Sequence, residues 1–190
     1  MAKNLLSLKL LGSPSVFLNQ EKVFFPFAKI NALLYYLHIN GAVNREEIAG
    51  ILWENKDNQT AKKNLRNTIY QANKLLGGEW IVAPNRTVLS LNPECAIESD
   101  VELFTDHPAE HLSLYQGDFL QGFYLKDSEA FDYWVSKMRT RYEQLYIQAC
   151  YQQMETEKDQ LDLKEAERNL RRLISIDEFD EKNYHLLMKL

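Results

Sequence analysis

Apolar and polar residues alternate at the start of the chain. Residues 6–10 place leucine at every second position, which is the period of a half-buried strand, because neighbouring side chains of a strand point to opposite faces. Two further apolar runs, at 16–18 and 23–25, flank the polar residues 19–22. This arrangement predicts a β-hairpin.

Helical spacing follows the predicted hairpin. Between residues 30 and 37 the apolar residues recur at intervals of three and four, which places them on one face of a helix. Asn40-Gly41 offers a left-handed cap that ends this helix. A second helix is predicted from Asn44, whose side chain can cap it while Glu47 reaches back to complete a capping box.

The third predicted helix, from Gln59 to Leu76 after a cap at Asp57 or Asn58, is basic on one side. No acidic residue occurs between Gln59 and Gly78, although a solvated helix face usually mixes charges, because Glu is a good helix former. The buried stripe is predicted to be Ala61, Leu65, Ile69, Ala72 and Leu76. The outward face carries Lys63, Asn67, Tyr70 and Lys74, with Arg66 and Gln71 at its flanks. Lys62 is a further cation that could reach phosphates.

Cationic and amide side chains suit phosphate oxygens and base edges, since Arg pairs with guanine and Asn or Gln with adenine. The alternative for this helix alone is a solvent-exposed face that happens to lack acids.

A second hairpin is predicted next, from the apolar runs at 80–82 and 88–91, with Arg86 near its tip. The order of small sheet, two helices, basic helix and hairpin is typical of a winged helix-turn-helix, in which the last helix enters the major groove.

The second half of the chain has helical spacing throughout. A short helix is predicted from Asp100, a long one over 128–157, another over 163–173 after the polar break 157–160, and a further one from Tyr184. Antiparallel helix pairs of this kind build tetratricopeptide repeats, whose period is about 34 residues.

Ala166 would occupy the position where paired helices of such a repeat approach closely. A generic helical bundle is the alternative that periodicity leaves open. Residues 184–190 are amphipathic and lack a polar closing face, which repeat arrays need for solubility. We therefore expect the chain to be a fragment of a longer protein, or these residues to pack on another surface.

Residues 5–92 resemble the OmpR-type winged-helix domain, in the form that opens the antibiotic-regulatory-protein (SARP) activators. The resemblance implies that the helix at 59–76 is the recognition helix and that its outward residues face DNA. The predicted hairpin tip has Arg86 as its one cation, so a smaller contribution of the wing is expected. The matching segments are Leu11-Gly12-Ser13, Ala32-Leu33-Leu34-Tyr35-Tyr36-Leu37, Val43-Asn44-Arg45-Glu46-Glu47-Ile48, Leu52-Trp53, Leu65-Arg66-Asn67-Thr68-Ile69-Tyr70 and Leu75-Leu76-Gly77.

Residues 114–123 resemble the signature of the bacterial transcriptional activator domain (BTAD), a Tyr-x-Gly-x-Phe-Leu-x-Gly-Phe pattern. Phe131, Trp134 and Arg139 follow at about the spacing of that family. The resemblance implies an α+β winged helix-turn-helix domain over 1–95, followed by an all-α tetratricopeptide-like domain over 96–190. It also implies contacts with RNA polymerase and occupation of DNA as a homodimer or side-by-side pair.

Composition and charge agree with a globular protein of two unlike halves. Of the 190 residues, 45% are apolar and 12% aromatic, which excludes global disorder. Two cysteines exclude a disulfide scaffold, and the apolar runs fall short of the ~18 residues of a membrane span.

The two halves differ in charge. Residues 1–95 contain 11 Lys and Arg against 7 Asp and Glu, a net of +4, whereas residues 96–190 contain 11 against 20, a net of −9. With no signal peptide at the N-terminus, we expect a cytoplasmic protein without membrane contact.

No pattern for catalysis, a cofactor or a metal stands out. His107 and His111 are four residues apart, but Pro108 adjoins the first and no third ligand follows. Cys95 and Cys150 lack a CxxC partner, and neither a glycine-rich phosphate loop nor a nucleophile elbow occurs. We therefore expect no enzyme activity, cofactor or metal site.

The sequence predicts a bacterial transcription regulator, an activator by its resemblance, that binds specific double-stranded DNA through residues 1–95. Residues 96–190 would dimerise or contact partner proteins. The alternative from another class is a protein-interaction adaptor, in which the helical half does the work and the winged domain makes no DNA contact.

Overall fold

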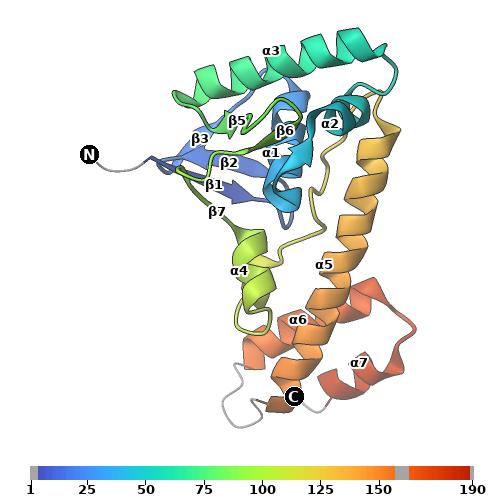
Figure 1. The fold of residues 1–190 in the computed structure, drawn as a ribbon. Coiled ribbons are helices and arrows are strands. Elements are labelled where there is room, and N and C mark those ends of the chain that lie inside the picture. The colour runs from blue at the N-terminus through green and yellow to red at the C-terminus, as the bar shows by residue number, and fades with distance from the viewer. Residues whose placement is uncertain (1–3, 157–162, 189–190) are drawn as a thin grey trace.

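The computed structural model describes residues 4–156 and 163–188 (Figure 1). The strands form two small sheets, ordered β3-β2-β1-β7 and β4-β6-β5. In Figure 1, α3 lies across one end of the molecule, and α5 runs from beside α2 towards α6 and α7 at the other end. The strands are β1 (Leu5–Lys9), β2 (Ser15–Leu18), β3 (Glu21–Val23), β4 (Val43–Asn44), β5 (Ile81–Val82), β6 (Val88–Leu91) and β7 (Ala96–Ser99). The helices are α1 (Ala28–Asn40), α2 (Arg45–Leu52), α3 (Asn58–Leu76), α4 (Asp100–Asp106), the 3-10 turn η1 (Leu112–Leu114), α5 (Glu129–Thr156), α6 (Leu163–Ile176) and α7 (Glu181–Leu187).

The predicted first strand and hairpin are confirmed, with a tighter turn than expected. β1 buries Leu6 and Leu8 and pairs antiparallel with β2. The turn between β2 and β3 consists of Asn19 and Gln20, which both have positive φ, as a two-residue hairpin turn requires. Glu21 and Lys22 therefore belong to β3 and not to a four-residue loop, and β3 ends at Val23, before Phe24 and Phe25 of the predicted apolar run.

The expectation that the second half is helical throughout is wrong for residues 96–99. They form β7, which pairs in parallel with β1 and completes the four-stranded sheet. A parallel neighbour satisfies the hydrogen-bonding groups of the other edge of β1. The sheet is therefore built from both halves of the chain.

The three helices predicted in the first half are confirmed. All six residues from Ala32 to Leu37 in α1 are buried, and Gly41 ends this helix with φ 70°. At α2, the Asn44 side chain accepts hydrogen bonds from the backbone N–H groups of Glu46 and Glu47, at 2.8 and 3.4 Å. β4 pairs with β6 of the second hairpin, so that hairpin is attached to the start of α2.

The predicted helices of the second half are α4, α5, α6 and α7. Ala166 in α6 is buried, as expected of a small residue where helices pack closely. The helix expected from Tyr184 is α7, which begins at Glu181. Tyr184 and, just beyond the helix, Met188 were expected on its apolar face but are 42% and 76% exposed, whereas Asn183 is buried and accepts a hydrogen bond from Tyr151. The expected polar break 157–160 and Leu190 lie outside the described residues. None of the helices that the structure describes is long and apolar enough to cross a bilayer.

The segment 115–123, singled out as a motif, joins the sheet to α5. Its backbone bonds to the chain just after β1, with Leu120 N donating to Leu10 O at 2.9 Å and Gly12 N donating to Asp118 O at 3.1 Å. A Cβ on Gly117 would lie 3.1 Å from the Gly12 Cα, so this position favours glycine. On the other side, Arg139 of α5 donates to the carbonyls of Phe119 and Leu120.

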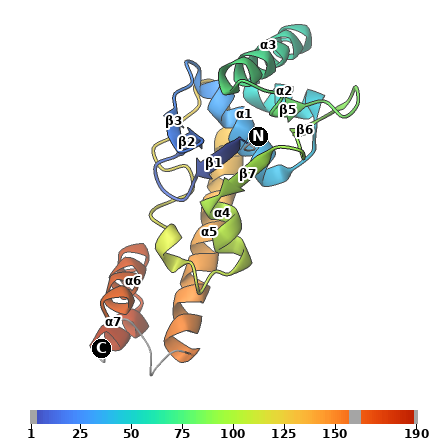
Figure 2. The same cartoon turned by 90° about the vertical axis from the view of Figure 1, so that its left-hand side faces the viewer.

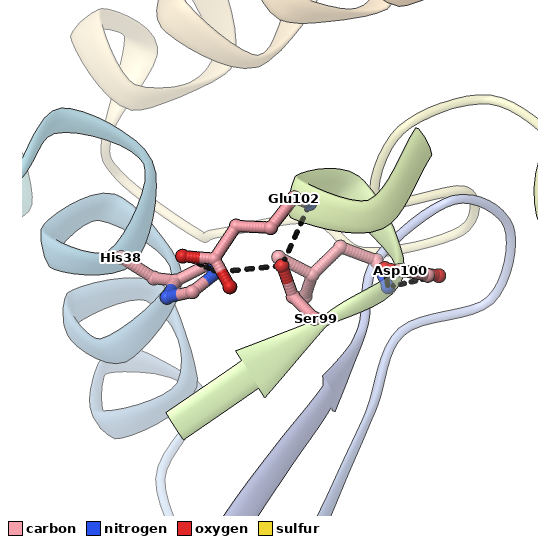
Figure 3. A network of polar contacts seen from close by, with 5 residues as sticks. His38, Ser99, Asp100 and Glu102 are labelled. Atoms are coloured by element: carbon pink, nitrogen blue, oxygen red, sulfur yellow. Dashed lines mark hydrogen bonds and ion pairs between the residues drawn. The ribbon is translucent and has the colours of Figure 1, made fainter. Parts of the chain in front are cut away.

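A second set of hydrogen bonds links the start of α4 to α1 and to the chain just after β1 (Figure 3). The Ser99 hydroxyl accepts from the backbone N–H of Glu102 and lies 2.7 Å from His38 Nε2. The Asp100 carboxylate accepts from the backbone N–H groups of Leu10 and Leu11 at 2.8–3.0 Å. Burial lowers the pKa of His38 to about 4, so the imidazole is neutral at pH 7 and its Nε2 can accept the Ser99 proton.

Acidification is predicted to weaken the fold through His38. The unfolded chain takes up a proton at the ordinary pKa of 6.5 and the folded chain only near 4. Stability is therefore fully present above pH 6.5 and falls as the pH approaches 4, by up to roughly 3 kcal/mol for this shift. Burial raises the pKa values of Asp100 and Glu102, which acts in the opposite direction.

The comparison of wild type with His38→Gln isolates the histidine, because both proteins keep the two carboxyl groups. Urea unfolding between pH 7 and pH 4 should show the wild type losing stability relative to the variant. Parallel pH profiles for the two proteins would contradict this assignment.

Candidate nucleic-acid interface

The ends of α3 are fixed by local hydrogen bonds. The Asp57 side chain accepts from the backbone N–H of Thr60 at 2.9 Å, and hydrogen bonding from Thr60 lowers the pKa of this carboxyl. Gly77 ends the helix in the left-handed conformation, with φ 67°, where a side chain would be strained. Asp57 was one of the two residues expected to cap this helix, and the structure confirms it.

One stripe of α3 packs into the core of the first half. Ile69, predicted on this stripe, is only half-buried, and Thr68 beside it is 8% exposed. The buried side chains of the helix are Ala61, Leu65, Thr68, Ala72 and Leu76. Because these residues are enclosed, the rotation of α3 about its axis is fixed, and the opposite side chains point outward.

The outward face of α3 carries cations, an amide and a tyrosine. Lys63, Arg66, Asn67 and Lys74 are exposed, and Tyr70 is 60% exposed. Among the described residues, none of the three cations forms an ion pair. Figures 1 and 2 show α3 at the outer end of the molecule in both views. This face is therefore open to a large partner.

Lys62 differs from the other predicted cations. Its Nζ lies 2.6 Å from a carboxylate oxygen of Glu46 in α2, and its side chain is half-buried. An ion pair between partly exposed groups is weak. Lys62 can therefore exchange Glu46 for another anion, but it starts with a partner that the sequence did not indicate.

The second hairpin adds cations beside the start of α3. The backbone N–H of Arg45 donates to the carbonyl of Thr87 at 2.8 Å, which brings the start of α2 to the hairpin tip. Arg86 in this tip is exposed. A hollow of about 280 Å³ separates these groups, lined by Arg45, Glu46, Lys62, Leu65, Arg66 and Arg86.

Arg45 is a functional candidate that the sequence did not reveal. Its position depends on the pairing of β4 with β6, and no local pattern signals this pairing. The hairpin tip itself is ordered by Asn85, whose side chain accepts from the backbone N–H groups of Thr87 and Val88 at 2.9 Å.

Asn73, on the same amide-rich helix, has a structural role. Its side-chain oxygen accepts from the backbone N–H groups of Trp80 and Ile81, and its Nδ2 donates to the Ile81 carbonyl. Trp80 Nε1 donates to the carbonyl of Leu76 at 3.1 Å. These bonds hold the second hairpin against the end of α3.

The turn that precedes α3 rests on the start of α5. The Ser128 hydroxyl donates to the Ile51 carbonyl at 2.5 Å, and the Glu54 carboxylate accepts from the backbone N–H of Ala130 at 3.1 Å. On the other side, Lys29 donates to the Leu52 carbonyl, and burial lowers the pKa of this amine. The basic helix is thereby connected to both halves of the chain.

The groups considered for other chemistry do not come together as a reactive site. Across residues 4–156 and 163–188, no three His, Cys, Asp or Glu side chains are grouped as metal ligands. Burial raises the pKa of Cys150 to about 12, which keeps the thiol protonated. Ser99 and His38 are in contact, and Glu102 Oε1 lies 3.8 Å from His38 Nε2. In a catalytic triad the hydroxyl and the carboxylate contact different imidazole nitrogens. Here both face Nε2, so the three residues do not form a catalytic relay.

Comparison with known proteins gives a likeness to solved structures but none to a family model or a curated protein. A solved structure, Mycobacterium tuberculosis EmbR in complex with a low affinity phosphopeptide, superposes on 98% of this chain with a TM-score of 0.72 and 20% sequence identity. The chain covers 54% of that protein, about half its length. It therefore shares a fold, a small mixed sheet followed by several helices, with part of EmbR.

Two neighbouring substitutions on α3 are predicted to differ strongly in their effect on stability. Leu65 is 1% exposed, so Leu65→Ala should leave a cavity and lower the free energy of unfolding by about 2–5 kcal/mol. Arg66 is exposed, so Arg66→Ala should change it by less than about 0.5 kcal/mol. Urea unfolding measures both. The reverse order of effects would mean that the two faces of the helix have been exchanged.

Proposed function

We propose that this chain is a DNA-binding transcription regulator whose α3 enters the major groove. The observation that carries the proposal is the outward face of α3. It presents Lys63, Arg66, Asn67 and Lys74 to solvent without a carboxylate partner among the described residues. Lysines provide phosphate contacts that set position, and Arg and Asn provide base-edge contacts that set sequence.

The finer architecture belongs to the same proposal. Residues 1–95 would be an OmpR-type winged helix-turn-helix, with α3 as the recognition helix and the β5–β6 hairpin as the wing. Residues 96–190 would be a BTAD-like, tetratricopeptide-like domain, as in SARP activators, and β7 would complete the sheet of the first domain. The fold shared with EmbR and the burial of Ala166 support this assignment.

The wing would have a larger role than Arg86 alone provides. Arg45 lines the same hollow as Arg86 and Arg66, so three guanidinium groups lie near one another beside the start of α3. Guanidinium groups bind phosphate in bidentate fashion. We propose that Arg45 and Arg86 contact one phosphate backbone while Arg66, Asn67 and Tyr70 face the bases.

The helical half would supply the protein contacts. Its net charge of −9 disfavours DNA, so we assign dimerisation, side-by-side pairing on DNA and contact with RNA polymerase to residues 96–190. These partners, and a cytoplasmic location, follow from the resemblance to SARP activators.

Salt dependence of DNA binding tests the proposal. If four of the six cations Arg45, Lys62, Lys63, Arg66, Lys74 and Arg86 reach phosphates, log K against log salt should have a slope of roughly −3.6. Lys63→Gln and Lys74→Gln should each make the slope shallower by about 0.9. Fluorescence anisotropy with a labelled random duplex measures it, and nonspecific Kd values of about 10⁻⁴–10⁻⁶ M are expected near physiological salt.

Lys182→Gln is the matched control, because this exposed lysine lies on α7, at the other end of the molecule from α3 (Figure 1). It should leave the slope unchanged. A folded protein without salt-dependent binding to any duplex would refute the proposal and favour the protein-interaction adaptor. With a selected site, Arg66→Ala or Asn67→Ala should weaken binding by roughly 1–3 kcal/mol.

A further inference from the structure

A small hollow in the helical half has the chemistry of an anion site. It measures about 260 Å³ and lies between η1, α5 and α6, and α6 is at the other end of the molecule from α3 (Figure 1). Three residues of α6, one turn apart or less, contribute to it. The lining residues are Leu112, Ser113, Tyr115, Gln116, Tyr146, Arg168, Asn169 and Arg172.

Arg172 is a cation with an aromatic support and no carboxylate partner. Its guanidinium lies 4.8 Å from the ring centre of Tyr115 and 5.4 Å from that of Tyr146, and the two rings are stacked 4.5 Å apart. Its Nη1 donates to the carbonyl of Tyr115 at 2.5 Å. In the described part of the chain Arg172 forms no ion pair. The remaining N–H groups of its guanidinium are donors for another acceptor.

Asn169 supplies a second donor beside Arg172. The residue is 5% exposed, and its Oδ1 accepts from the Tyr146 hydroxyl at 3.1 Å. Its Nδ2 is buried and has no acceptor among the described residues. Buried N–H groups in folded proteins almost always have an acceptor, so this donor is left for an acceptor from outside the described residues.

We propose that this hollow binds a small oxyanion through Asn169 Nδ2 and Arg172. Asn169 Nδ2 and the remaining N–H groups of Arg172 are donors, and phosphate and carboxylate oxygens are the acceptors that match a guanidinium fork. Arg168, which shares its charge with Glu165 at 3.4 Å, lies at the rim. The volume admits inorganic phosphate or a small carboxylic acid. Because the lining comes from η1, α5 and α6, a bound anion would hold these three elements together.

Thermal unfolding of the whole chain with added anions tests the site. Inorganic phosphate and malonate are titrated separately at constant ionic strength, with chloride as the balancing ion. The proposal predicts a saturable rise in Tm with at least one of them. A response to phosphate alone identifies a phosphate ligand, a response to malonate alone identifies a carboxylate ligand, and a response to both identifies a general oxyanion site.

Asn169→Asp is the decisive variant. It keeps an oxygen that accepts from Tyr146, but it replaces the donor by a negative oxygen, so the Tm response should be lost. Arg172→Lys keeps the positive charge but loses the planar guanidinium with its paired N–H donors, so the affinity for the anion should fall at least about tenfold. This variant tests the proposed site if Asn169→Asp does not fold. Arg171→Gln is the control: this exposed arginine pairs with Glu167 at 2.7 Å, does not line the hollow, and should respond as wild type does.

The absence of a saturable response to either anion in the wild type would overturn the proposal. An equal response in the wild type and in the folded Asn169→Asp or Arg172→Lys variant would also overturn it. Neither result depends on whether α3 binds DNA.

Discussion

The arrangement of the chain depends on one strip of backbone, residues 116–121, which is hydrogen-bonded on two sides. On one side it pairs with the chain after β1, where Leu11 and Phe119 form an isolated bridge. On the other side Arg139 of α5 donates to the carbonyls of Phe119 and Leu120. Buried polar groups are costly unless they are paired, so this strip holds the sheet and the long helix in one relative position. The glycine- and phenylalanine-containing pattern at 115–123 thus has a structural role at the junction of the two halves.

From that junction, α5 supports the turn before α3. Ser128 and Ala130 at its start bond to Ile51 and Glu54. The turn is held from one side by the helical half and from the other by Lys29. The start of α5 therefore contacts the turn that precedes α3, and Tyr146 of the same helix lines the hollow beside α6.

Local patterns were enough to predict most helices and both hairpins. The caps at Asn44, Asp57 and Gly77 and the stripe of α3 follow from residues within a few positions of one another. β7 could not be predicted in this way, because its partner β1 is about 90 residues distant in the sequence and its own four residues carry no strong signal. The exposure of Tyr184 and Met188 likewise depends on Asn183 taking the buried position in α7.

The candidate site shows the same limit. The outward direction of Lys63, Arg66 and Lys74 follows from helical geometry, whereas the Lys62–Glu46 ion pair and the place of Arg45 beside Arg86 depend on tertiary packing. Helical periodicity likewise did not distinguish Asn73, which anchors the hairpin, from Asn67, which is exposed.

Hydrogen–deuterium exchange of the whole chain, with and without a duplex selected from a random library, tests the central claim most directly. If the outward face of α3 lies in the major groove, DNA should slow exchange in residues 58–76 and in the hairpin tip at 83–87. Slower exchange confined to the helical half, with α3 unaffected by bound DNA, would contradict the account.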